Sequence, residues 1–200
     1  GMRFTQAYAA SPICSPTRAS ILTGKNPARI NLTQWIGGPG NPDYERNLPL
    51  EEVLLPEQLK TAGYTNGFFG KLHLNNRAGE KTYWPQEQGF DINVAGHWRG
   101  GLYIPNKFFS PWDLPNIENG PDGEYMTDRL AAEAAQFIED HRDKPFLAYV
   151  SFYTVHAPFD APKERVDKYK KKSKKMALTD TDRFGQEHAA GKTFPSRKAH

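Results

Sequence analysis

One apolar stretch restricts the fold of this chain more than any other feature. After Pro145 the sequence reads Phe-Leu-Ala-Tyr-Val-Ser-Phe, ending at Phe152. A nearly continuous apolar run of this length is typical of a strand buried on both faces, as the strands of parallel sheets are. Where helices and strands alternate along the rest of the chain, such a strand predicts an α/β sheet covered by helices.

Two helical patterns precede this strand. Ser15-Pro16 and Gly24 frame a short helix, in which Ser15 can act as the N-cap, Pro16 suits the first turn and Gly24 suits the exit. Pro56 and Gly63 frame a second helix in the same way. The chain therefore offers helices on the amino-terminal side of its best strand.

The alternation continues through the middle of the chain. Residues 64–69 predict a strand, and residues 124–141 carry the clearest helical pattern. The apolar positions on one face of that helix are Met126, Leu130, Ala134, Phe137 and Ile138. Together these segments predict an α/β fold, namely a three-layer sheet with helices on both faces.

The charge is distributed unevenly along the chain. Residues 163–200 carry nine lysines and three arginines against five carboxylates, a net charge of +7, and the total of +3 leaves −4 for residues 1–162. We expect a catalytic domain within 1–162 and a lysine-rich polar tail or surface loop in 163–200. The mildly acidic body argues against nucleic-acid binding, and no apolar run is long enough to span a membrane.

Cys14 is the first candidate for chemistry. It immediately precedes the predicted helix, where free backbone N–H groups and the helix dipole favour an anion. Arg18 lies one turn further on the same face, so an anion above Cys14 would meet amide donors and a guanidinium together. A lone cysteine is more often a small buried residue, but the Ser-Pro start, the arginine spacing and the following Thr23-Gly24 favour function.

Three further residues follow predicted strands. In α/β sheets, ligands bind beyond the carboxyl ends of the strands. Lys71 and His73 are two positions apart, so in an extended segment both side chains would point into one pocket. His156 comes soon after the apolar run and is followed by Ala157-Pro158. Taken alone, each fits a solvated lysine or a satisfied loop histidine about as well.

The segment between the two strands is rich in glycine and proline. Residues 75–121 predict a long irregular excursion over the active face, and loops of that length in compact domains are usually functional. Within it, the segment 97–101 (His-Trp-Arg-Gly-Gly) could line a substrate pocket, although an exposed loop with a packed tryptophan is the simpler interpretation.

These motifs resemble those of one enzyme family. Residues 14–24 (Cys-Ser-Pro-Thr-Arg-Ala-Ser-Ile-Leu-Thr-Gly) resemble the signature of type I, formylglycine-dependent sulfatases, Cys-x-Pro-x-Arg with a downstream Thr-Gly. Residues 70–74 are similar to the family's Gly-Lys-x-His, and residues 156–158 to its later histidine motif. The resemblance covers about residues 3–162. It implies the alkaline-phosphatase-like fold and a sulfuric ester hydrolase.

The resemblance also implies a role for each candidate residue. Cys14 would be oxidised to formylglycine, whose hydrate attacks the sulfur of a sulfate ester and later releases sulfate. Arg18 would hold the hydrate. Lys71 and His156 would bind the sulfate oxygens and assist the leaving oxygen, and His73 would support deprotonation of a formylglycine hydroxyl. Fixed positive groups suit a transition state that carries charge on its oxygens.

The metal site of the family is poorly represented. Type I sulfatases bind a divalent cation, usually calcium, through an Asp-Asp pair upstream of the cysteine and an Asp-Asn pair well downstream. No Asp-Asn occurs in this sequence, and of that ligand set only Cys14, once modified, is present. Since hard cations need several oxygen ligands, we expect calcium to bind this chain poorly. The resemblance therefore predicts an internal piece of a larger enzyme, whose sheet is incomplete at both ends.

Partners and compartment follow from the same resemblance. It implies a sulfated small molecule or glycan as substrate and a formylglycine-generating maturation enzyme as partner. By family analogy the protein is periplasmic or secreted, although the first residues lack the apolar stretch of a signal peptide. The single cysteine excludes an internal disulfide.

Two alternatives compete with the sulfatase hypothesis. The chain could be a catalytically silent fragment or pseudoenzyme that lacks most metal ligands, or a related phosphatase or phosphonate hydrolase of the same superfamily. A cysteine phosphatase is disfavoured, because its loop requires an arginine six positions after the cysteine and position 20 is serine.

Overall fold

The structure is a computed structural model that describes residues 2–37, 47–76, 81–103 and 108–176, and the backbone of 188–189 and 192–193. The chain divides into two compact units, Gly1–Pro158 and Phe159–His200. All candidate site residues lie in the first.

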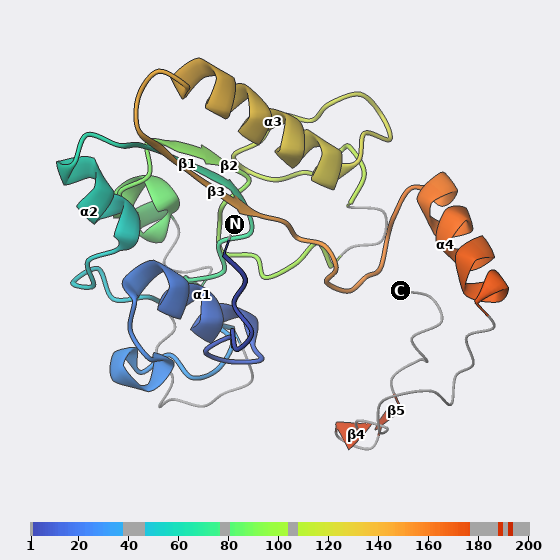
Figure 1. The fold of residues 1–200 in the computed structure, drawn as a ribbon, viewed down its shortest axis with the longest axis horizontal. Coiled ribbons are helices and arrows are strands. Elements are labelled where there is room, and N and C mark those ends of the chain that lie inside the picture. Colours follow the sequence, from blue (N-terminus) through green and yellow to red (C-terminus); the bar gives the residue numbers. More distant parts are fainter. Residues whose placement is uncertain are drawn as a thin grey trace. The chain divides into compact units, whose positions relative to one another are not determined.

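A three-stranded parallel sheet forms the centre of the first unit (Figure 1). Strand β1 (Thr65–Gly70) lies between β2 (Ile92–Val94) and β3 (Phe146–Ser151), and both neighbours run parallel to it. In the register between β1 and β3, Gly70 pairs with Ser151, so these two strands end at the same edge. The predicted parallel α/β sheet is confirmed.

The side chains of β1 divide the interior into two cores. Phe68 is fully buried on one face, where its ring lies 5.1 Å edge-on from Phe90 and 5.2 Å from the stacked ring of Tyr149. Phe69 points to the other face and contacts Phe137 at 5.5 Å between ring centroids. Alternation of neighbouring side chains across a strand explains why two consecutive phenylalanines serve different cores.

Helices cover both faces of the sheet, as Figure 1 shows. Helix α3 (Met126–His141) packs on the Phe69 side. Helices α1 (Cys14–Thr23) and α2 (Leu55–Thr61) and the short helix η1 (Pro27–Ile30) lie on the Phe68 side. The predicted three-layer arrangement is therefore confirmed. Ile138 departs from the predicted helix face, since it is 41% exposed.

The start of α1 differs from the prediction. The helix begins at Cys14, and Ser15 lies inside it with its Oγ accepting a hydrogen bond from the Ile36 N–H at 3.2 Å. Ser15 is therefore not the N-cap. The predicted exit is confirmed, because Gly24 adopts a left-handed φ of 68° and its N–H donates to Ser20 O. Cys14 consequently stands in the first turn, where backbone N–H groups lack helical partners.

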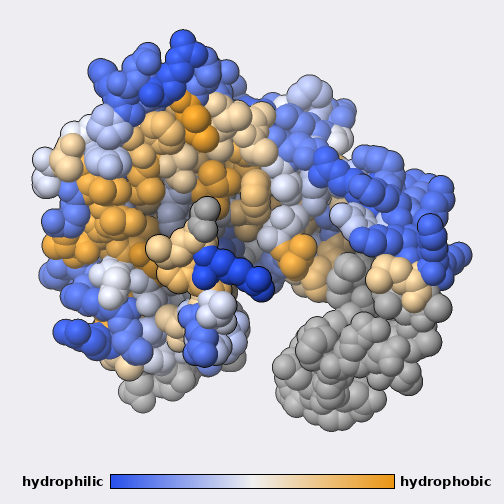
Figure 2. Space-filling model, in the orientation of Figure 1, coloured by the Kyte–Doolittle hydropathy of each residue, from blue (hydrophilic) through white to orange (hydrophobic). Residues whose placement is uncertain are grey.

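Strand β3 is less buried than its sequence predicts. It is an edge strand of the described three-stranded sheet, and Val150 is 39% exposed, with Phe152 just beyond the strand at 37%. Figure 2 shows hydrophobic side chains over much of one face of the first unit. Burial on both faces was thus a wrong expectation for this strand, because an apolar run does not specify whether a strand is central or at an edge.

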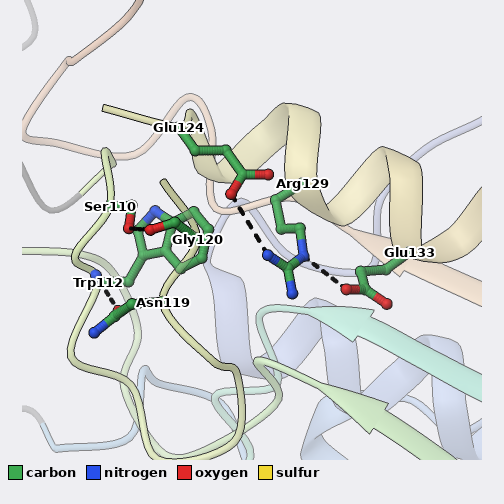
Figure 3. A network of polar contacts seen from close by, with 7 residues as sticks. All are labelled: Ser110, Trp112, Asn119, Gly120, Glu124, Arg129 and Glu133. Atoms are coloured by element: carbon green, nitrogen blue, oxygen red, sulfur yellow. Dashed lines mark hydrogen bonds and ion pairs between the residues drawn. The ribbon is translucent and has the colours of Figure 1, made fainter. Parts of the chain in front are cut away.

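The excursion between the strands is partly regular. It contains η3 (Pro85–Gln88) and β2. The part around Ser110, Trp112 and Gly120 lies beside α3 (Figure 3). Arg129 of α3 bonds to Glu124 at 3.5 Å and Glu133 at 2.6 Å, and its guanidinium lies 5.7 Å from the Trp112 ring centroid. Ser110 Oγ donates to Gly120 O at 2.7 Å. This part of the excursion packs on α3 and adds to the core there.

The second unit contains helix α4 (Lys163–Lys175) and a short antiparallel pair, β4 (His188–Ala189) with β5 (Lys192–Thr193). The weak periodicity of the lysine-rich tail did not indicate this helix, and none of the side chains of α4 is buried. Among the residues that the structure describes, no helix has the length and apolar character needed to cross a membrane.

Candidate active site

Cys14 lies in the first turn of α1 and is half-buried. Its Sγ is 3.3 Å from Nδ1 of His73, a residue 59 positions further along the chain. Burial lowers the pKa of Lys71, and its side chain is close enough to Cys14 that the interaction between them raises it. Two candidate residues from one loop therefore meet the candidate nucleophile at a helix N-terminus.

Arg18 joins three elements at this edge of the sheet. Its Nη1 donates to Lys71 O at 2.7 Å, just after β1, and to Ser151 Oγ at the end of β3. Burial lowers the pKa of Arg18, and the neighbouring Cys14 opposes that lowering. The arginine thus fixes α1 to the ends of β1 and β3 in addition to lying beside Cys14, a structural role that the helical spacing alone did not indicate.

Lys71 is a buried cation, only 3% exposed. Its N–H donates to Ser151 O at 2.7 Å, which places it directly beyond the paired ends of β1 and β3. Burial lowers its pKa most, the charge of Arg18 lowers it further, and Cys14 opposes both effects. A buried ammonium with so few anionic neighbours suits a site that receives an anion.

His73 is buried beside Lys71, as the two-residue spacing predicted, but its backbone is not extended, since φ is 55°. Its Nε2 lies 3.0 Å from Ile36 O. Burial, with the nearby charge of Lys71, lowers the pKa of His73 to about 4. The ring is therefore neutral at physiological pH and can accept a proton or a hydrogen bond on the side that faces Cys14.

His156 occupies the turn that follows β3, five positions beyond the strand end, and is half-buried. Its Nδ1 bonds to Ala157 O at 2.8 Å; because a carbonyl only accepts, Nδ1 donates and Nε2 stays available. His156 also makes the smallest contribution to the lowered pKa of His73, after burial and the charge of Lys71. Tyr103, which the sequence did not indicate, lies edge-on to His156 at 5.4 Å.

A second buried group adjoins the site and lies in segment 97–101, which the sequence offered as a possible pocket lining; the preferred interpretation of this segment as an exposed loop was wrong. His97 is fully buried; its Nδ1 accepts the Arg99 N–H at 3.0 Å and its Nε2 lies 3.3 Å from Tyr153 Oη. Tyr153 Oη donates to Ala95 O at 2.8 Å. The sequence did not indicate the contact with Tyr153, because that residue is 56 positions away and becomes a neighbour of His97 only when the chain folds.

His97 gives the protein a pH-dependent stability. Burial lowers its pKa from 6.5 to about 3, so between these pH values the unfolded chain binds a proton that the native protein does not. Native stability should therefore fall as pH decreases from 6.5 towards 3, by about 1.4 kcal/mol per pH unit from this residue. Urea unfolding of wild type and His97→Gln at pH 7 and pH 5 measures the difference. Equal pH dependence in both proteins would contradict the assignment.

The described residues do not supply a metal site. They contain no group of three or more histidine, cysteine, aspartate or glutamate side chains placed to hold an ion. The groups around Cys14 are Arg18, Lys71 and His73, which are cationic or nitrogen donors, whereas calcium requires several oxygen ligands. The described residues thus do not fit a calcium ion, and no chemical step is derived through one.

Comparisons with known proteins point to one family. The sulfatase family model matches residues 1–189. The uncharacterized sulfatase YdeN of Escherichia coli is 30% identical over 193 residues, covering 86% of this chain and 32% of that protein. The N-acetylgalactosamine-6-sulfatase of Mus musculus is 34% identical over 191 residues, covering 82% and 35%.

A solved structure gives the same result for the fold. The crystal structure of Ps i-CgsB in complex with k-i-k-neocarrahexaose superposes with a TM-score of 0.60 and 25% identity, covering 81% of this chain and 39% of that one. The chain spans about a third of the length of the curated relatives it matches. By its match to the family model over nearly its whole length, this chain belongs to the sulfatase family.

Proposed function

We propose that this chain carries the sulfate-cleaving centre of a sulfuric ester hydrolase, with Cys14 oxidised to formylglycine. The observation that carries the proposal is the position of Cys14 Sγ, in the first turn of α1 and 3.3 Å from His73 Nδ1. The buried Lys71 is a neighbouring charge, since its pKa is affected by Cys14. A nucleophile within hydrogen-bond reach of a base, beside a fixed cation, is the arrangement that group transfer from an anionic ester requires.

Formylglycine at this position would supply, as its hydrate, the hydroxyl group that attacks sulfur. The residues around it have separate tasks. Lys71 would bind a sulfate oxygen through its ammonium, which burial leaves with few competing anions. His73, neutral and with Nδ1 facing position 14, would accept the proton of the attacking hydroxyl.

His156 would contact the leaving oxygen. Because its Nδ1 is engaged with Ala157 O, Nε2 is the nitrogen that can contact a sulfate oxygen or the departing alcohol. Arg18 would hold the hydrate at position 14 while its Nη1 keeps α1 attached to Lys71 and Ser151. The contacts made within the chain support these proposed roles.

The substrate proposed for this site is a sulfated carbohydrate. Two similar proteins support that class: one is named N-acetylgalactosamine-6-sulfatase, and another was solved in complex with k-i-k-neocarrahexaose. A formylglycine-generating enzyme is the proposed maturation partner, and the proposed location is the periplasm or the extracellular space. Calcium enters the proposal only as a cofactor of the family, and the described residues contain no group of three or more histidine, cysteine, aspartate or glutamate side chains that could hold it.

The experiment has two stages. The chain is co-expressed with a formylglycine-generating enzyme, and mass spectrometry of the peptide that contains Cys14 detects the conversion of thiol to aldehyde. Hydrolysis of matched aryl sulfate and aryl phosphate monoesters is then measured. Conversion with preferential sulfate cleavage supports the proposal. Conversion without turnover identifies a catalytically silent chain, and faster phosphate cleavage identifies a phosphatase; either result defeats it.

A further inference from the structure

The imidazole of His73 is enclosed on its edges and on one face. Ile36 O lies 3.0 Å from Nε2, and Cys14 Sγ lies 3.3 Å from Nδ1. The face is covered by Gly100: a Cβ built there would stand 2.3 Å from Cε1, 2.6 Å from Nδ1 and 2.7 Å from Nε2 of His73. Separations below 3.0 Å are not tolerated, so no side chain fits at position 100 unless the ring moves.

Glycine is required at position 100 only because a larger side chain would clash with the His73 ring. The φ of Gly100 lies outside the left-handed region, unlike that of Gly70 or Gly89. An alanine could adopt this backbone conformation without strain, and only its contact with the imidazole would be unfavourable. Substitution therefore tests the contact between Gly100 and His73 without altering the preferences of the loop backbone.

The hydrogen bonds of His73 select one tautomer. Ile36 O can only accept, so the proton of the neutral ring is on Nε2. Nδ1 then carries the lone pair, and it faces position 14. A ring that rotated or flipped would lose the Ile36 bond and turn a different atom towards Cys14.

The loop that carries Gly100 is held by its own buried bonds. Arg99 N–H donates to His97 Nδ1, so Nε2 of the neutral His97 ring carries the proton and can donate to Tyr153 Oη at 3.3 Å. The hydroxyl of Tyr153 in turn donates a hydrogen bond to Ala95 O at 2.8 Å. The loop also binds the backbone of the residue it covers, since His73 N–H donates to His97 O at 3.2 Å.

We propose that Gly100 is a positioning residue for His73: by packing flat on the imidazole, it holds the ring in one plane and one tautomer, with the Nδ1 lone pair directed at position 14. The proposal rests on the proposed function for its catalytic consequence, but the orientation of the ring is measurable without turnover. Neighbouring Gly101 approaches the second histidine less closely, with a hypothetical Cβ 3.0 Å from His156 Nδ1.

The test is nitrogen NMR of the chain with ¹⁵N-labelled histidine at neutral pH, with His73 signals assigned by their loss in His73→Gln. Wild type should show a pyridine-like Nδ1 and a pyrrole-like Nε2 for this ring. Gly100→Ala should shift both signals towards a tautomer average. A wild-type ring that is Nδ1-protonated or averaged would overturn the proposal, whatever the variant does.

Gly67→Ala is the matched control. Its Cβ would also be crowded, at 2.7 Å from Phe69 and 3.0 Å from Phe137, and its φ lies outside the left-handed region, but it does not contact His73. If the His73 signals change in both variants, the cause is a general loss of packing and the proposal is refuted. A change confined to Gly100→Ala supports it, and unchanged signals in a folded Gly100→Ala refute it.

Kinetics then separates this proposal from the proposed function. In matured enzyme, Gly100→Ala should lower kcat about a hundredfold, the usual effect of misplacing a reacting group by about 1 Å, with KM nearly unchanged. If wild type shows the expected tautomer but no turnover, the positioning role of Gly100 stands and the sulfatase proposal fails. If turnover is present and Gly100→Ala leaves kcat unchanged, the sulfatase proposal stands and the positioning role of Gly100 fails.

Discussion

Replacement of Cys14 by alanine is expected to abolish sulfate-ester cleavage and to leave the fold intact. The proposed reaction depends on an oxidised carbon at position 14, which alanine cannot supply, so kcat should fall on the order of 10⁴- to 10⁶-fold, as when nucleophiles are removed from other hydrolases. The side chain is half-buried and its contacts are polar, with His73 and Lys71, so the loss of packing is small. Turnover of an aryl sulfate and circular dichroism measure the two expectations.

Ser20→Ala provides the control for this variant. Ser20 is on the same helix and is only partly buried; its carbonyl, which the substitution keeps, accepts the capping bond from Gly24. It should therefore retain wild-type turnover. Residual hydrolysis by Cys14→Ala above a few per cent of wild type would exclude Cys14 as the source of the nucleophile. Loss of folding in Cys14→Ala alone would instead assign the residue a structural role.

The local features of this protein were predictable because they depend on neighbouring residues. The exit of α1 follows from Gly24, and β1 from the aromatic residues of segment 64–69, which ends before Gly70. The edge position of β3 was not predictable, because it depends on which strands pair with it. An apolar composition is the same for a central strand and for an edge strand whose apolar side chains are partly exposed.

In the site, too, the residues of local motifs were predictable and the contacts between distant residues were not. Motifs suggested Cys14, Lys71 and His73, because each stands at a predicted element boundary. The contacts that orient His73 come from 37 positions before it, at Ile36, and from the loop at Gly100. Neither residue has a chemistry-bearing side chain: one contributes a carbonyl and the other the absence of a side chain. Sequence patterns do not identify such contributions.

Truncation of Phe68 should cause a large loss of stability. Phe68 is fully buried in the central strand, and its ring contacts Phe90 at 5.1 Å and Tyr149 at 5.2 Å. Phe68→Ala removes this burial and both aromatic pairs and leaves a cavity, which should cost about 3–5 kcal/mol. Since domains of this size are stable by only about 5–15 kcal/mol, the urea midpoint should fall markedly.

Val53→Ala is the surface control for that measurement. Val53 is 54% exposed, so its truncation should change the free energy of unfolding by no more than about 0.5 kcal/mol. Loss of Phe68 should also affect the candidate site. Phe68 lies in β1, and Lys71 follows β1 directly and donates its backbone N–H to Ser151 O of β3. If β1 positions Lys71, Phe68→Ala should weaken catalysis in the fraction that remains folded. A cost below about 1 kcal/mol for Phe68→Ala would contradict the central position of β1 and, with it, the placement of Lys71.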